Sequence, residues 1–296
     1  MSSHWTKWLS EPGNIRIVTI EATDLMLDLI LQQGLQGSAQ SGYADAIIAG
    51  LLVASAHKSS ESINLNAQGS GVYKQAIVDA SPEGRVRGFL IEETNPELHT
   101  YGADGKSGPW GTGILSVLYT KNFEGQIPYR GIVPISSGYL DEAINEYYRD
   151  SEQMTSLVGL YLEHDGQTLR IARGALIQAL GGASKEELDL LKSLKIDDLR
   201  AMAKVAQNRD AFTKEASRML NGLTFKMVDN QNLKAFCNCS QERIERALVL
   251  TGYEDAMHAL GEDPFVEVTC DFCRNHYKVS AERLKALFSS DSSRLQ

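Results

Sequence analysis

Apolar side chains recur at two different spacings in the first part of the chain. Residues 22–33 repeat them at helical intervals and stop at Gly34, and residues 139–150 show a similar helical pattern. Residues 43–57 contain the longest apolar stretch of the chain, which favours a helix buried in a core. We therefore expect three helices in this part of the chain.

Strand spacing dominates between these helices. Residues 62–68 alternate apolar and polar side chains, residues 69–71 (Gly-Ser-Gly) form a predicted hairpin turn, and residues 72–79 return as a strand. Further strands are predicted at residues 86–92, 114–121 and 129–135. Consecutive strands joined by short glycine-containing turns indicate an α+β fold, with an antiparallel sheet and helices packed on it.

A glycine pair at Gly181-Gly182 separates this part from a charged, helical stretch. Ser184 and Glu187 form a capping-box pattern, the helical spacing continues to about Leu220, and a strand-like segment follows Thr224. We predict a core domain at residues 1–182, a helical linker at 183–231 and a small C-terminal domain at 232–296.

The net charge and the composition of the chain argue against several classes of function. The 296 residues carry a formal net charge of −9, which argues against general binding to nucleic acid or to anionic membranes. The longest apolar stretch is interrupted by Asp45 and Gly50 and is too short to span a bilayer, and the N-terminus lacks the apolar run of a signal peptide. We expect a cytoplasmic protein whose thiols are normally reduced.

The four cysteines provide the most specific signal. Cys237 and Cys239 are separated by one residue, Cys270 and Cys273 by two, and thirty residues lie between the pairs. Zinc prefers four soft ligands in a tetrahedron, and two close pairs from separate turns meet that need. A zinc ion would also supply folding free energy to a C-terminal segment too small for a large core.

Several interpretations of the cysteines remain open at this point. They could be ordinary buried cysteines, an inert zinc site, a disulfide framework, or a redox switch in which oxidation removes the metal ligands. A C-x-C pair is less usual in purely structural zinc sites, and either pair can close into a local disulfide. His276 is a further possible ligand, although four thiols already suffice.

The residues around the cysteines resemble those of the heat-shock protein 33 family. The similarity covers residues 236–243, 247–248 and 267–273, with Tyr277 beyond. It extends to segments of the front part of the chain: 68–71, 78–80, 84–88, 129–134, 147–148, 151–153 and 180–182.

This resemblance implies a metal site and a regulatory mechanism. It implies one zinc per chain in the reduced state, bound by Cys237, Cys239, Cys270 and Cys273, and an inactive chaperone whose linker packs on the core. Oxidation then forms the disulfides Cys270–Cys273 and Cys237–Cys239, releases the zinc and unfolds the linker. The exposed surface holds unfolding client proteins without ATP, and oxidised members tend to form homodimers.

The linker sequence suits such a role because it is charged yet carries regularly spaced apolar residues: Leu188, Leu191, Leu194, Leu199, Met202, Val205, Met219 and Leu220. It can pack on a partner surface when folded and offer apolar side chains when unfolded. Residues 98–110 do not map onto the family, and we predict a loop there.

Two other function classes compete with a chaperone. A zinc-ribbon nucleic-acid module is disfavoured because the chain from Cys237 onward has seven Lys and Arg against ten Asp and Glu. A thiol–disulfide oxidoreductase normally has its C-x-x-C at the start of a helix in a βαβ unit, which is not the pattern here. Phosphate-loop and nucleophile-elbow motifs are absent from the sequence. We therefore expect a binding protein rather than an enzyme.

Overall fold

The computed structural model describes residues 2–11, 13–57, 61–93, 108–121 and 128–291. The chain forms two compact units, Met1–Phe236 and Cys237–Gln296. The predicted division of the first unit into a core at 1–182 and a linker at 183–231 remains a prediction. Most of the predicted loop at 98–110 falls outside the described residues, and its last three form a turn.

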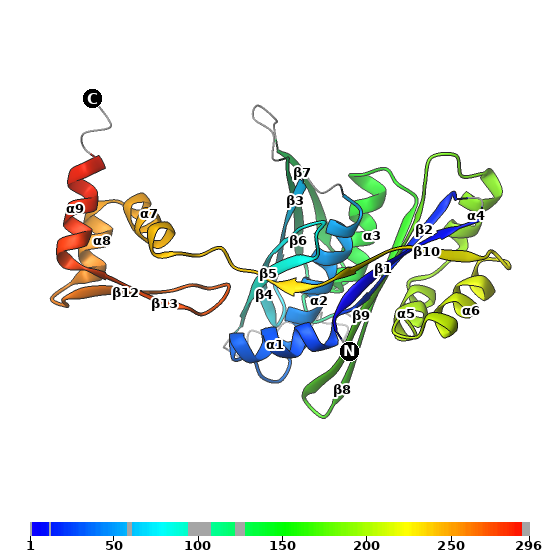
Figure 1. Ribbon diagram of the computed structural model, residues 1–296, viewed down its shortest axis with the longest axis horizontal. Coiled ribbons are helices and arrows are strands. Elements are labelled where there is room, and N and C mark those ends of the chain that lie inside the picture. Colours follow the sequence, from blue (N-terminus) through cyan, green and yellow to red (C-terminus); the bar gives the residue numbers. More distant parts are fainter. Residues whose placement is uncertain (1, 12, 58–60, 94–107, 122–127, 292–296) are drawn as a thin grey trace. The chain divides into compact units, whose positions relative to one another are not determined.

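One sheet of the first unit has five strands, all antiparallel to their neighbours. Their order is β10 (Phe225–Asn232), β1 (His4–Ser10), β2 (Ile15–Glu21), β9 (Thr168–Ala179) and β8 (Ser156–Asp165) (Figure 1). We call it sheet A. Its central strands come from the two ends of the core segment, so sheet A joins residues far apart in the sequence.

The second sheet, sheet B, has six strands. Their order is β11 (Lys234–Ala235), β5 (Arg85–Glu92), β4 (Tyr73–Ala80), β3 (Glu61–Gly69), β6 (Gly113–Lys121) and β7 (Tyr129–Ile135). Among the strands that the structure describes in this sheet, only the short β11 runs parallel to its neighbour. The structure confirms the predicted antiparallel strands and the turn between β3 and β4.

Helix α2 (Ala39–Ser55) lies between the two sheets and contacts strands of both (Figure 1). Its side chains are buried on nearly every face, which confirms the predicted core helix. Close packing requires glycine at Gly50, where an added Cβ would lie 2.7 Å from Val78 Cγ1. Helices α1 (Thr23–Gln33) and α3 (Leu140–Asp150) also pack on this core, as predicted.

Three helices cover the other face of sheet A: α4 (Lys185–Ser193), α5 (Ile196–Lys204) and α6 (Arg209–Met219). Side chains along β2 point alternately to the two faces of sheet A. This second face therefore also carries apolar side chains that must be covered. Val18 and Ile20 point into the main core, whereas Ile15 and Ile17 point into a second apolar cluster with the three helices. The predicted capping box at Ser184 and Glu187 starts α4.

The sequence did not predict every element. Strands β1, β2 and β8 were not expected, and the helical stretch after Ser184 is three short helices rather than one continuous pattern. The breaks occur at Lys195 and Asn208, each an extended residue directly before the next helix. The Asn208 side chain accepts a hydrogen bond from the Ala211 backbone, which favours a new helix start.

The second unit is small. It contains α7 (Gln241–Thr251), α8 (Tyr253–Leu260), the hairpin of β12 (Phe265–Thr269) and β13 (His276–Ser280), and α9 (Ala281–Asp291). Its described apolar core has few fully enclosed side chains: Ala256, Leu260, Val266, Val279 and Leu284. Such a core supplies little free energy of folding alone, so another stabilising interaction is needed.

Candidate metal centre

The structure brings the four cysteines together in the second unit. Cys237 and Cys239 precede α7, and Cys270 and Cys273 lie in the turn between β12 and β13. All four sulfur atoms lie within 4.8 Å of one another. The Sγ atoms of Cys237 and Cys270 are 3.8 Å apart, and those of Cys239 and Cys273 are 3.2 Å apart. The two sequence pairs therefore converge on one point.

The hairpin turn fixes one pair of sulfurs. The backbone N–H of Cys270 donates to the Asn275 carbonyl at 2.9 Å, and the N–H of Arg274 donates to the Cys270 carbonyl at 2.8 Å. Arg274 has a left-handed backbone with φ of 58°, which reverses the chain. Both cysteine side chains thus lie on the inside of a short, hydrogen-bonded turn.

The sulfur arrangement fits a four-coordinate metal. Zn–S bonds of about 2.3 Å in a tetrahedron place the sulfurs about 3.8 Å apart, which is within the range found here. Burial raises the pKa of the Cys270 and Cys273 thiols. Four closely spaced thiolates would repel one another without a cation, so the donor set needs a thiophilic metal to be deprotonated together.

Tyr277 on β13 contacts the cluster. Its hydroxyl donates to Cys239 Sγ at 2.9 Å, and this hydrogen bond raises the pKa of Tyr277 to about 12. Such a contact orients a ligand from outside the metal shell. In the sequence Tyr277 stands out only as part of the family resemblance, since its contact with Cys239 depends on the register of the hairpin.

His276 is not part of the cluster. Its Nδ1 is hydrogen-bonded to Thr269 Oγ1 at 2.9 Å, and the metal-ligand group found among the described residues contains cysteines alone. The C-x-x-C pair lies between two antiparallel strands and not at the start of a helix. This position differs from that of a thioredoxin-like redox motif.

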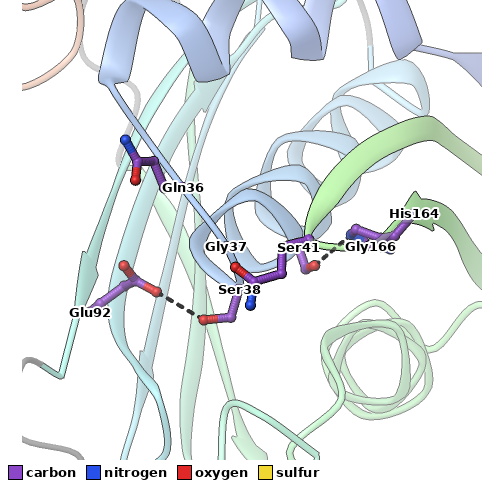
Figure 2. A pocket seen from close by; sticks show the side chains of 8 residues that line it. Gln36, Gly37, Ser38, Ser41, Glu92, His164 and Gly166 are labelled. Atoms are coloured by element: carbon purple, nitrogen blue, oxygen red, sulfur yellow. Dashed lines mark hydrogen bonds between the residues drawn. The ribbon is translucent and has the colours of Figure 1, made fainter.

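A surface pocket in the first unit offers a different candidate (Figure 2). It lies at the start of α2, where Ser41 Oγ is 2.8 Å from His164 Nε2. A serine–histidine pair suggests a nucleophile, but that chemistry also needs a group that orients the histidine. Glu92, the carboxylate of this pocket, is hydrogen-bonded by Ser38 at 3.4 Å instead. The pocket therefore supports no catalytic assignment.

Together, the fold and the sulfur cluster define a class of protein: a mixed α and β unit followed by a small module with a four-thiol metal site. The chain belongs to the Hsp33 protein family, whose model matches residues 3–280. This match confirms the resemblance found in the sequence.

Curated relatives match over nearly their whole length. The 33 kDa chaperonins of Latilactobacillus sakei and Geobacter sulfurreducens are 28% and 29% identical, and each alignment covers 98% of this chain and 99% or 96% of the relative. The 33 kDa chaperonin of Synechococcus elongatus is 30% identical, with 94% of each chain covered. The names of these relatives denote chaperones and not enzymes.

A solved structure shares the fold. The crystal structure of the 33 kDa chaperonin (heat shock protein 33 homolog) from Thermotoga maritima matches with a TM-score of 0.79 and 20% sequence identity. The match covers 99% of this chain and all of that one. The predicted α+β fold is confirmed. In the described part of the chain, each helix is too short or too polar to cross a membrane.

Proposed function

We propose that this protein is a redox-regulated holdase chaperone that works without ATP. In the reduced state the four cysteines bind one zinc ion, the linker at 183–231 covers sheet A, and client binding is off. Oxidation of the cysteines releases the zinc and unfolds the linker, and the protein then binds unfolding proteins and prevents their aggregation. Membership in a chaperone family supports the chaperone role, and the redox mechanism is what we propose in addition.

The convergence of the four sulfurs in a unit with a small core is the observation that carries the proposal. Loss of a metal from such a unit removes much of the free energy that keeps it folded. In the sequence the unit begins a few residues after the linker, with the short strand β11 between them. Unfolding of the unit therefore acts on the segment that covers apolar side chains of sheet A, including Trp8, Ile17 and Ile177.

Hydrogen peroxide is the oxidant in the proposed formation of each disulfide. Two cysteine thiolates lose two electrons and form a disulfide, and one hydrogen peroxide takes up these two electrons together with two protons from the solvent and becomes two water molecules. We assign the disulfides Cys237–Cys239 and Cys270–Cys273 on the family resemblance and not on sulfur distances, since the sulfurs of Cys237 and Cys270 and those of Cys239 and Cys273 also lie close together. A sulfur in a disulfide is a poor zinc ligand, so the metal leaves.

The partners follow from this mechanism. The clients are unfolded or partly unfolded proteins, the oxidised chain forms a homodimer, and nucleic acid and membranes are not partners. A cytoplasmic location suits the switch because thiols stay reduced there until oxidative stress. These assignments are part of the proposal.

The test measures metal release and chaperone activity on one sample. Reduced, zinc-loaded protein is treated with peroxide at raised temperature, while a dye reports free zinc and light scattering reports aggregation of a thermally unfolding client. We expect about one zinc per chain to be released before aggregation is suppressed. Zinc release without client binding, or client binding by the untreated protein, would overturn the switch.

Two variants sharpen this test. Cys273→Ser removes one ligand and should weaken zinc binding and uncouple activity from peroxide. His258→Gln removes a potential ligand of the same unit that lies outside the sulfur cluster. It should leave zinc content and the peroxide response unchanged.

A further inference from the structure

Helix α5 of the linker packs directly on sheet A. An added Cβ at Gly159 of β8 would lie 2.6 Å from the Arg200 backbone nitrogen and 2.7 Å from Leu199 Cβ. The helix therefore contacts the strand almost backbone to backbone. It also inserts fully buried apolar side chains into the cluster beneath it: Leu199, Met202 and Ala203. These contacts account for the attraction of α5 to the sheet.

Charged groups hold α5 in addition to these apolar contacts. Arg200 reaches the carboxylate of Asp141 on α3, with Nε 3.0 Å from Oδ2 and Nη2 3.2 Å from Oδ1. The Asp141 side chain is only 4% exposed, whereas that of Arg200 is 35% exposed. The pair joins a buried anion of the core to a linker cation in a two-pronged geometry that arginine favours.

The burial of Asp141 makes it depend on Arg200. Besides Arg200, the carboxylate accepts a hydrogen bond of 3.0 Å from the Glu142 backbone N–H and a longer one of 3.4 Å from the Leu160 backbone N–H, and neither brings a positive charge. A buried carboxylate that loses its cation is strongly destabilised unless water reaches it. Water reaches Asp141 when α5 leaves, so removal of the Arg200 charge favours the detached linker.

A second arginine holds the C-terminal end of α5. Arg173 on β9 is 5% exposed and pairs with Glu21 on β2. It also donates to the backbone carbonyl of Lys204 and to the side chain of Gln207. Lys204 is the last residue of α5, where carbonyl groups lack partners within the helix. Arg173 therefore caps the end of the linker helix from the core.

We propose that Arg200 and Arg173 form a polar lock, at the middle and at the C-terminal end of α5, that sets how readily the linker leaves the core. The lock rests on the proposed function, in which linker release turns the chaperone on. Apolar contacts weaken gradually as a helix slides, whereas two-pronged hydrogen bonds to buried groups require one position. The lock thus makes linker release an all-or-none step.

The first experiment breaks the lock in the reduced, zinc-loaded, full-length protein. Arg200→Met keeps an apolar stem of similar length and removes the charge. We expect limited proteolysis within residues 183–231 to accelerate by at least about tenfold, because the buried Asp141 carboxylate then opposes docking. Zinc content should stay at the wild-type level. Unchanged proteolysis of the linker would overturn the lock.

A double variant distinguishes the lock from general damage. Adding Asp141→Asn to Arg200→Met removes the uncompensated charge, so the linker should regain much of its protection. The control is Arg218→Met on α6, whose exposed pair with Glu215 lies within the same linker. It should leave the cleavage rate unchanged. A double variant that is cleaved as fast as Arg200→Met would contradict the lock.

Aggregation assays on the same samples separate the two proposals. If Arg200→Met releases the linker and suppresses client aggregation without peroxide, both the lock and the proposed function are supported. If the linker is released and clients still aggregate, the lock stands and the proposed function fails. If the linker stays protected while the wild-type protein responds normally to peroxide, only the lock fails.

Discussion

We expect the carboxyl group of Asp45 to make the stability of the first unit depend on pH. Asp45 on α2 lies near Asp141 and Arg200, and burial raises its pKa to about 8, with the Asp141 charge adding to the increase. Its ordinary pKa, which applies to the unfolded chain, is 3.8. The folded protein thus holds this proton more tightly than the unfolded chain. The resulting stabilisation is complete below about pH 4 and is lost as the pH rises to about 8.

We predict that Asp45→Asn flattens this dependence. The wild-type free energy of unfolding should decline between about pH 4 and pH 8 by up to about 1.4 kcal/mol per pH unit from this group. The variant lacks that contribution and should gain relative stability toward pH 8. Denaturant titrations from pH 5 to pH 9 measure the difference.

The control for this experiment is Asp150→Asn, whose carboxylate is exposed at the end of α3. Its stability curve should run parallel to that of the wild type through this range. Parallel curves for Asp45→Asn would show that the Asp45 proton is not coupled to folding.

At this scale the sequence predicted that the four cysteines come together, as they do in the structure, but it did not predict their surroundings. The spacing of four cysteines was enough to select the cluster, because few other arrangements suit C-x-C and C-x-x-C pairs. The Tyr277–Cys239 contact and the Arg200–Asp141 pair join elements whose relative placement the sequence does not reveal. Such contacts depend on the tertiary fold rather than on spacing.

Among the elements, α2 depends on close packing more than on helix propensity. Alanine favours helix over glycine by about 1 kcal/mol, so propensity alone predicts that Gly50→Ala stabilises the helix. The added methyl would lie 2.7 Å from Val78 Cγ1 in a fully buried interface. Overpacking of this kind typically costs about 1–3 kcal/mol, so we predict a net loss of stability.

Gly181→Ala is the matched control, because nothing lies within 4 Å of the Cβ it would add. Thermal unfolding of both variants measures the contrast. A Gly50→Ala protein as stable as Gly181→Ala would mean that sheet B shifts to accept the methyl group at little cost.

The strands that the sequence did not predict share a physical cause. Both faces of sheet A are covered, one by the main apolar core and the other by α4, α5 and α6. Strand β2 is therefore buried at nearly every position, and its sequence, with Ile17 and Val18 adjacent, lacks the regular alternation that marks a half-exposed strand. Sheet B was easier to predict because β3, β4 and β7 alternate clearly between buried and less buried positions.

For the whole molecule, the two units should respond differently to loss of metal. We predict that a strong chelator, added to the reduced protein at neutral pH, removes hydrogen-exchange protection from residues 237–291. Strands β3 and β9 of the first unit should keep their protection, because they lie in a large core of their own. Mass spectrometry of exchanged peptides gives both results at once.

Cys239→Ser should resemble the chelated wild-type protein before any chelator is added, since it removes a ligand and the partner of Tyr277. Persistent protection of residues 237–291 in both samples would show that the small apolar core suffices to fold this unit. The metal would then have no structural role.

The edge strand β10 of sheet A affects what is exposed when the linker detaches. β10 runs beside β1 from the pair Ser10–Phe225 to the pair His4–Asn232, and β10 forms the edge of sheet A. If β10 separates from β1 beginning at its C-terminal end, these pairs open one after another, starting with His4 and Asn232. Each opened pair leaves a backbone donor or acceptor of β1 without its partner. Detachment of the linker would thus turn β1 from an interior strand into an exposed edge strand, with which an extended polypeptide can pair.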